Sequence, residues 1–282
     1  MTSRRGYRIV LVAIVAGVAI VVAAGVWCLR APLPDRPSRL DVEVLNLSSV
    51  PKRQGGTQLC WAYAMLAAVE ADRLRLGDTL DLPIGPVVAA LAAEGRDPAT
   101  CRAMAPTLLS LARRHGLYDS LCGGADFVAL CSQPGQSYGR WVVPDYPDNW
   151  ERHRMLNLHP DTLLALAERA VRQGRGVCWE GDVGSRGFSF EQGLAVTLLP
   201  PFLLRCKAAL RPPADGHCLS LEGLVRDDEG VPYFVAKNSW GTDNPYGGRM
   251  LMSFSYFRWN TVAVVVPRAV LPQQLLRCAT QY

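Results

Sequence analysis

The longest apolar stretch of the chain lies near its N-terminus. Residues 9–29, IVLVAIVAGVAIVVAAGVWCL, contain no charged or strongly polar side chain. As an α-helix these 21 residues measure about 30 Å, the thickness of the hydrocarbon core of a bilayer. Arg4, Arg5 and Arg8 precede the stretch, so the positive-inside rule keeps residues 1–8 in the cytoplasm and exports the remainder. The pattern predicts a single-pass membrane anchor at 9–29, with the lipid bilayer as a partner.

A cleaved signal peptide is the alternative interpretation of the same stretch. The apolar part of a signal peptide is usually about 7–15 residues long and ends at a cleavage site of small residues. Ala23, Ala24 and Gly25 would provide such a site. Both interpretations place the rest of the chain on the periplasmic or extracellular side of the membrane.

The remaining chain divides into a stem at 30–48 and a folded domain at 49–282. The stem contains APLPDRPSR at 31–39, which has three prolines and no hydrophobic periodicity, and we expect it to be extended and stiff. A domain of this length is large enough to bury a substantial core.

Apolar positions three and four residues apart predict three helices in the first part of the domain. They span residues 60–76, 106–115 and 161–173, and a glycine follows each of them, as is common where a helix ends. Residues 122–150 are rich in Gly, Pro and Ser and are predicted to form a loop.

The pattern changes to short strands after about residue 175. Residues 217–225, HCLSLEGLV, and 231–237, VPYFVAK, are separated by RDDEG, which is typical of a β-hairpin with a glycine-containing turn. Further strands are predicted at 249–254 and 261–266. We therefore expect an α+β fold of two lobes, a helical lobe followed by an antiparallel β lobe.

Composition narrows the function classes. The net charge of +5 is small and spread along the chain, so nucleic acid is not an expected partner. None of the nine cysteines forms a C-x-x-C pair, so we expect neither a metal site nor another cofactor. Outside the cytoplasm some of the cysteines beyond the anchor should pair as disulfides, in a connectivity that sequence leaves open. Cys218 is expected to be a core or disulfide residue.

The predicted hairpin brings two polar residues together. His217 begins its first strand and Asn238 follows the end of its second strand, and antiparallel pairing makes these two ends neighbours. The amide oxygen of Asn238 would accept a hydrogen bond from one ring nitrogen and fix the tautomer of His217. The other ring nitrogen would then be free to take a proton from a nucleophile.

Cys60 is the candidate nucleophile. It begins the helix predicted at 60–76, where the helix dipole and the free backbone N–H groups stabilise a thiolate. Attack on a carbonyl would create an oxyanion, held by the backbone N–H of Cys60 and by a side-chain amide. Gln54 is preferred for that second donor, and Gln58 is the alternative.

These residues carry a family resemblance. QGGTQLCWAYA at 54–64 and KNSWG at 237–241 resemble the cysteine and asparagine motifs of papain-like cysteine peptidases, with His217 between them in the expected order. The resemblance is strongest to the bleomycin hydrolase and aminopeptidase C branch. It is carried by GVCWEGDVGSRGFSFEQG at 176–193, DDEGVPYFVAKNSWG at 227–241, GGRMLMSFSYF at 247–257 and VAVVVPRAVLPQQLL at 262–276.

The resemblance implies a two-lobed fold with the substrate between the lobes. It implies a peptidase with Cys60, His217, Asn238 and Gln54 as catalytic residues. Trp240 would shelter the histidine and asparagine from water, and Trp61 would be a supporting, packing residue. The resemblance also has departures, since the half-cystine that commonly lies three residues before the nucleophile is Thr57 here.

The function predicted from sequence is hydrolysis of peptide bonds through a Cys-His-Asn triad and a thioester intermediate. The specificity is expected to be aminopeptidase-like or otherwise restricted, with a peptide or protein as substrate. Two alternatives stay open: a papain-like binding module without catalysis, and a transpeptidase or amidase of the cell envelope. The oligomeric state does not follow from sequence.

Overall fold

A computed structural model describes residues 12, 15–17, 32–78, 81–123, 126–132, 141–142, 155–210 and 216–278. The predicted anchor at 9–29 lies outside these residues except at 12 and 15–17. The predicted cytoplasmic segment 1–8 and residues 30 and 31 also lie outside them. Within the described ranges, no helix has the length and apolar character needed to cross a bilayer. Membrane attachment and the side of the membrane stay predictions.

The three helices predicted from periodicity are present. The helices are α2 (Cys60–Arg75), α3 (Gly85–Ala93), α4 (Thr107–Arg114), α5 (Tyr118–Cys122), α6 (Pro160–Arg172), α7 (Pro201–Leu210), α8 (Phe254–Asn260), α9 (Gln273–Leu276) and the 3₁₀ turn η1 (Arg268–Val270). α2, α4 and α6 match the prediction to within one residue at each end. His159 caps α6 by accepting a hydrogen bond from the Asp161 N–H, and Pro160 fits the first turn because it needs no hydrogen-bond acceptor there.

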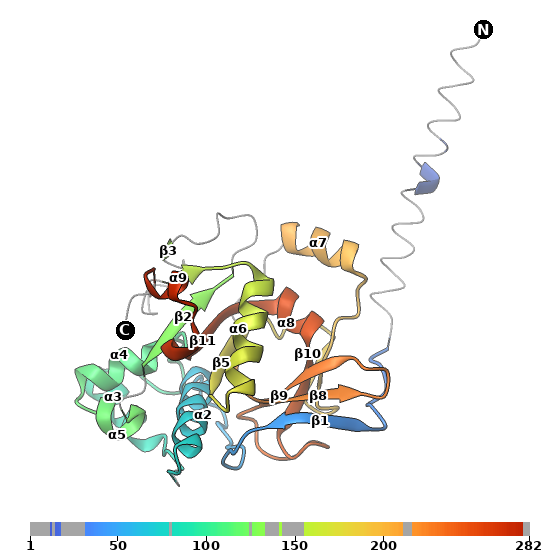
Figure 1. The fold of residues 1–282 in the computed structure, drawn as a ribbon. Helices are drawn as coiled ribbons and strands as arrows, with labels where there is room; N and C mark the ends of the chain where they lie inside the picture. Colours follow the sequence, from blue (N-terminus) through green and yellow to red (C-terminus); the bar gives the residue numbers. More distant parts are fainter. Residues whose placement is uncertain are drawn as a thin grey trace.

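The strands join in one sheet. They are β1 (Leu40–Leu45), β2 (Phe127–Cys131), β3 (Trp141–Val142), β4 (Met155–Asn157), β5 (Val177–Gly181), β6 (Phe188–Ser189), β7 (Leu194–Ala195), β8 (His217–Asp227), β9 (Pro232–Lys237), β10 (Arg249–Ser253) and β11 (Thr261–Pro267). Their order is β3-β4-β2-β11-β5-β8-β9-β10-β7-β6, with β1 paired to β8 beside this path. β1 lies within 30–48, so the sheet begins inside the segment predicted as stem (Figure 1).

Two cores form on opposite faces of the sheet because successive side chains of a strand point to opposite faces. In β11, Ala263 and Val265 pack with α2 to α5, whereas Val264 and Val266 pack with α6 and α8. Figure 1 shows α3, α4 and α5 grouped beside α2, apart from α6 and α8. The sheet therefore lies between two layers of helices.

The predicted division into a helical lobe and a β lobe is found only in part. The helices α2 to α5 do come together from the first half of the chain, and the mixed α+β class is confirmed. The sheet, however, also takes β2 and β4 from the middle of the chain and carries α6 on its other face.

The prediction of a loop over 122–150 is wrong at two places. β2 is buried along its whole length between β11 and β4, and β3 adds a short strand at the sheet edge. Because helices cover both faces of the sheet, every residue of β2 is apolar and the strand shows no alternation. A five-residue apolar run among Gly, Pro and Ser is too short to predict a strand from its periodicity. Residues 124–125, 133–140 and 143–150 lie outside the described part of the chain.

The hairpin β8–β9 matches the sequence prediction. Its strands pair antiparallel with Ser220 opposite Lys237, and Gly230 makes the turn with a positive φ of 78° that favours glycine. His217 and Asn238 therefore lie at the same end of the hairpin, at the edge of the helical layer.

The expected disulfides are not present among the described cysteines. No disulfide joins the eight described cysteines, from Cys60 to Cys278, to one another. Burial raises the pKa of Cys122 and of Cys131 to about 12, so both are protonated at neutral pH.

Candidate active site

Cys60 is the first residue of α2. The preceding residue, Leu59, is the N-cap and has no side-chain oxygen to accept hydrogen bonds from the first turn. The first-turn N–H groups and the positive end of the helix dipole therefore act on the thiol, and both favour its ionised form.

His217 and Asn238 meet as the hairpin predicts. Nε2 of His217 lies 2.7 Å from Oδ1 of Asn238, and both side chains are 2% exposed. Since an amide oxygen only accepts hydrogen bonds, Nε2 carries a proton, and Nδ1 is the nitrogen left to exchange a proton with a nucleophile. The same amide oxygen accepts the backbone N–H of Ser239 at 2.7 Å, which fixes the amide plane.

Cys60 packs against the core cluster that contains Cys218, the residue after His217 in β8. The Cys218 side chain first, and then His217, hold the pKa of the Cys60 thiol well below its usual 9.0, although burial acts in the opposite direction. The thiol at the start of α2 is therefore influenced by the same histidine that bonds to Asn238.

Trp240 covers this group from the β side. Its ring stacks on His217 with centroids 4.5 Å apart and an interplanar angle of 29°. Phe188 and Phe190 meet the other parts of the Trp240 ring edge-on, at 5.8 Å and 5.5 Å between centroids. Trp240 therefore lies over the imidazole, and its shelter of the hydrogen bond between His217 and Asn238 from water stays a prediction.

Gln54 lies beside the same site. Its loop pairs with the segment after Asn238: the Gln54 N–H donates to the Ser239 carbonyl at 2.7 Å, and an isolated β-bridge joins Arg53 and Trp240. Its side-chain Oε1 accepts from the Ser239 hydroxyl at 2.6 Å, and Nε2 donates to the Thr57 carbonyl at 2.8 Å.

Gln58, the alternative donor, has a different neighbour. Its side-chain oxygen accepts a hydrogen bond from Nε of exposed Arg102 at 3.4 Å. The loop pairing thus draws Gln54, and not Gln58, toward the segment that holds Asn238.

Trp61 is a core residue, as expected. It is fully buried, and its indole N–H donates to the Cys101 carbonyl at 3.1 Å. It packs within the core between α2 and the sheet, and so fixes the position of the helix that begins with Cys60.

A buried ion network lies behind the site. Nζ of Lys237 lies 2.8 Å from the Ser49 hydroxyl, 3.5 Å from Glu222 and 3.7 Å from Glu70. Lys52 adds a second ion pair to Glu70 at 2.9 Å. The network ties α2, β8 and β9 together, and sequence reasoning missed it although the lysine begins the KNSWG motif.

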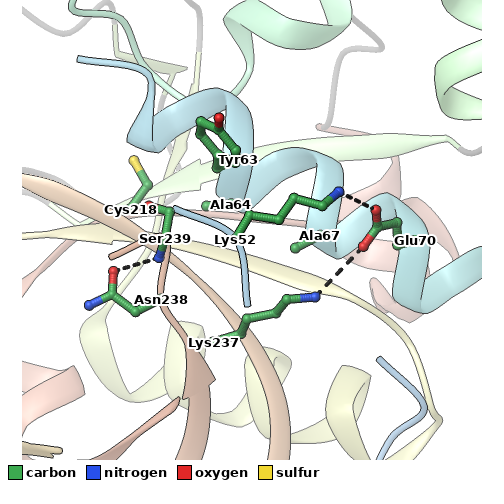
Figure 2. Close-up of a pocket in the computed structure, with 9 residues that line it drawn as sticks. All are labelled: Lys52, Tyr63, Ala64, Ala67, Glu70, Cys218, Lys237, Asn238 and Ser239. Carbon is green, nitrogen blue, oxygen red and sulfur yellow. Dashed lines mark hydrogen bonds and ion pairs between the residues drawn. The ribbon is translucent and has the colours of Figure 1, made fainter. Parts of the chain in front are cut away.

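A small cavity separates this network from the site. It holds about 10 Å³, room for roughly one water molecule. Figure 2 shows Cys218 and Asn238 at one end of the cavity, and Glu70 between Lys52 and Lys237 at the other. Among the described residues, no group of three or more His, Cys, Asp or Glu side chains is arranged to hold a metal ion.

Comparison with known proteins shows a similarity of fold to one solved structure. No protein-family model matches the chain, and no curated protein matches it in sequence. Among solved structures, the chain is similar in fold to PepW from Lactobacillus rhamnosis. The TM-score is 0.56 at 13% sequence identity, and the match covers 84% of this chain and 84% of the PepW chain. The mixed α+β architecture with its large sheet is thus shared with PepW.

Proposed function

We propose that the chain is a cysteine peptidase that hydrolyses peptide bonds through Cys60, His217 and Asn238. One observation carries the proposal: Nε2 of His217 lies 2.7 Å from Oδ1 of Asn238, and the pKa of the Cys60 thiol is lowered, owing first to the Cys218 side chain and then to this histidine. A nucleophile, a base and a group that orients the base are the three parts that covalent catalysis on a carbonyl requires.

In the proposed reaction the thiolate of Cys60 attacks the carbonyl carbon of a peptide bond. The proton of the thiol resides on Nδ1 of His217, which transfers it to the departing amine, so that a thioester forms on Cys60. Water then attacks the thioester, His217 takes its proton, and the carboxylic acid product leaves. Asn238 keeps the ring oriented through both steps by accepting the Nε2 proton.

The oxyanion of each tetrahedral intermediate is assigned to two donors. One is the backbone N–H of Cys60 at the start of α2. The other is the amide of Gln54, which has two N–H bonds and gives one of them to the Thr57 carbonyl. The second N–H is available to the oxyanion.

The similarity of fold to PepW supports the architecture on which the proposal depends. The motif resemblance to the bleomycin hydrolase and aminopeptidase C branch supports the cysteine type and an aminopeptidase-like or otherwise restricted specificity. The apolar run at 9–29 supports a single-pass anchor with the catalytic domain on the periplasmic or extracellular side.

The test is hydrolysis by the purified full chain of fluorogenic peptides with free and with blocked N-termini. We expect turnover that Cys60→Ala abolishes and that Cys278→Ala, which removes an exposed thiol elsewhere, leaves unchanged. A preference for free N-termini would identify an aminopeptidase. Hydrolysis that persists in Cys60→Ala contradicts the proposal.

A further inference from the structure

Arg102 lies on a loop between α3 and α4, residues 97–103, which is bonded to the chain around Cys60. We propose that Arg102 sets the specificity of the peptidase by attracting a carboxylate side chain on the acyl side of the scissile bond. The substrates would then be peptides with an aspartate or a glutamate close before the cleaved bond. This inference rests on the proposed function, because it concerns the substrate of the same site.

Two hydrogen bonds from the chain around Cys60 hold the loop at the start of α2. The carbonyl of Pro98 accepts the N–H of Gln58 at 3.2 Å, and the carbonyl of Cys101 accepts the indole N–H of Trp61 at 3.1 Å. The two donors precede and follow Cys60 in sequence. The loop therefore lies against the point at which α2 begins with the nucleophile.

The loop presents Arg102 at the surface. The two neighbours of this residue, Cys101 and Ala103, are 5% and 4% exposed and belong to the apolar core against which Cys60 packs, whereas Arg102 is exposed. The Cys101 N–H also donates to the Asp97 carbonyl at 2.8 Å, which closes the loop on itself. The backbone on both sides of Arg102 is thus fixed, and its side chain reaches the surface.

The guanidinium of Arg102 keeps most of its donors for a ligand. Its Nε donates to Oε1 of Gln58 at 3.4 Å, which directs the group toward the segment before Cys60. Among the residues that the structure describes, neither terminal nitrogen, Nη1 nor Nη2, has a hydrogen-bond or ion-pair partner. The planar group of an arginine binds a carboxylate through two parallel N–H donors. The chemistry of Arg102 therefore fits an acidic side chain.

Arg102 provides the positive charge on this side of the site. Residues 54–59, QGGTQL, have no charged side chain, and Asp97 is the other charged residue of the loop. Asp97 begins the loop, and its carboxylate accepts a backbone N–H of the same loop at 2.9 Å. Before residue 54, Arg53 forms an ion pair with Asp243, so its charge is offset. A substrate on this side of the site therefore meets the charge of Arg102.

The proposed reaction assigns the acyl part of the substrate to the side of the loop. Because His217 transfers a proton to the departing amine, the amine part lies on the histidine side, and the acyl part extends away from it. Gln54 bonds to the segment that follows the histidine's partner, whereas Gln58 bonds to Arg102. Since Gln58 is two residues from Cys60, a side chain shortly before the cleaved bond is within reach of the guanidinium.

The experiment compares fluorogenic peptides with aspartate, asparagine or lysine at the first or the second residue before the cleaved bond. For the wild type we expect kcat/KM to fall from aspartate to asparagine to lysine, by roughly threefold at each step, as is typical of an exposed charge pair. Arg102→Glu should reverse the order, and Arg102→Gln should abolish the preference. The asparagine peptide should be cleaved at a similar rate by all three proteins.

Arg113→Glu is the matched control, because it makes the same change of net charge on α4. The guanidinium of Arg113 packs over the ring of Tyr118, 4.4 Å from its centroid, and not on the segment before Cys60. This variant should keep the wild-type order. The inference is overturned if the wild type does not prefer aspartate, if the preference persists in both Arg102 variants, or if Arg113→Glu reverses it equally.

A second measurement needs no peptide cleavage. Cys60 is alkylated at pH 7 with iodoacetate, an anion, and with iodoacetamide, a neutral reagent of similar size, and the labelled site is identified by mass spectrometry. The ratio of the two rates reports the charge near the thiol. We expect Arg102→Glu to lower this ratio by roughly threefold, which corresponds to reversing one charge about 10 Å away in water. Arg113→Glu should leave the ratio unchanged.

The alkylation ratio separates the failure of this inference from that of the proposed function. An unchanged ratio in Arg102→Glu, at unchanged melting temperature, would mean that the guanidinium does not act on the site, and would overturn the inference. A lowered ratio in a chain that cleaves none of the peptides would overturn the proposed function and support the position assigned to Arg102.

Discussion

Nε2 of His217 lies 2.7 Å from Oδ1 of Asn238, across the open end of the β8–β9 hairpin. The register of the two strands brings the two residues together, and the Ser239 N–H fixes the plane of the amide. Any change that shortens the amide or shifts the hairpin therefore acts on the orientation of the imidazole.

Asn238→Ala should lower kcat by about tenfold to a hundredfold with a smaller change in KM, since a misplaced base costs on the order of 10²-fold. The reason is loss of the acceptor that selects the Nε2–H tautomer of His217. Steady-state kinetics on a fluorogenic peptide measures it. Asn238→Asp, which keeps an oxygen acceptor, is the matched control and should retain more activity. Equal kcat in wild type and Asn238→Ala would argue against an orienting role.

Trp240→Ala should open the hydrogen bond between His217 and Asn238 to water, because the indole ring stacks on the imidazole. Water then competes for both partners and weakens the bond. The imidazole N–H proton of His217, followed by NMR, should exchange faster with solvent, and kcat should fall by roughly tenfold. Trp240→Phe should show a milder change, because a ring remains. An unchanged exchange rate would mean that the cover is supplied elsewhere.

The rate at which Cys60 is labelled should depend on pH, and it should fall as the pH is lowered. Its pKa lies well below 9.0, owing first to the Cys218 side chain and then to His217, so the thiolate dominates at pH 9 and remains down to that lowered pKa. The rate with iodoacetamide should be flat above the pKa and fall about tenfold per pH unit below it. Cys122 and Cys131, with pKa values of about 12, serve as internal controls and should stay unlabelled at pH 7. A Cys60 profile with its midpoint at or above 9 would contradict the geometry of the site.

Removing a lysine from the buried ion network should lower the free energy of unfolding. Lys237 is 4% exposed at its side chain and faces Glu70 and Glu222, each 1% exposed. Lys237→Met should lower the free energy of unfolding by about 3–5 kcal/mol, because it leaves buried carboxylates less well compensated. Urea denaturation measures this change. Lys52→Met, at a lysine 26% exposed, should cost less, because Glu70 keeps Lys237. Equal losses from the two substitutions would show that burial does not set the cost.

Local pattern predicted the parts of the fold that local forces determine. α2, α4 and α6 have regular apolar spacing, and the hairpin has its turn at Gly230, so their sequences were sufficient. β1 and β2 were missed because each is a short strand that tertiary pairing stabilises, one within a proline-rich segment and the other within a stretch rich in Gly, Pro and Ser.

Part of the candidate site could also be predicted from local sequence, and part of it could not. The hairpin sufficed to bring His217 to Asn238, because their proximity follows from strand pairing. The bond from the Ser239 hydroxyl to Gln54 joins residues 185 apart in sequence, and Cys60 on α2 packs on the core cluster that contains Cys218 on β8. No pattern within either segment encodes such contacts, since they depend on how α2 packs on the sheet. Cys218 was expected to be a core or disulfide residue, and it lies in the core, 1% exposed.

The central claim is that Cys60 becomes acylated during turnover. The most direct measurement mixes the full chain with an activated amino-acid ester and records both the product burst and the intact mass of the protein within the first turnover. We expect a burst close to one equivalent per chain and a mass increase equal to one acyl group, mapped to Cys60 and lost on hydroxylamine treatment. Turnover without a burst, or an acyl group mapped to another residue, would contradict the account.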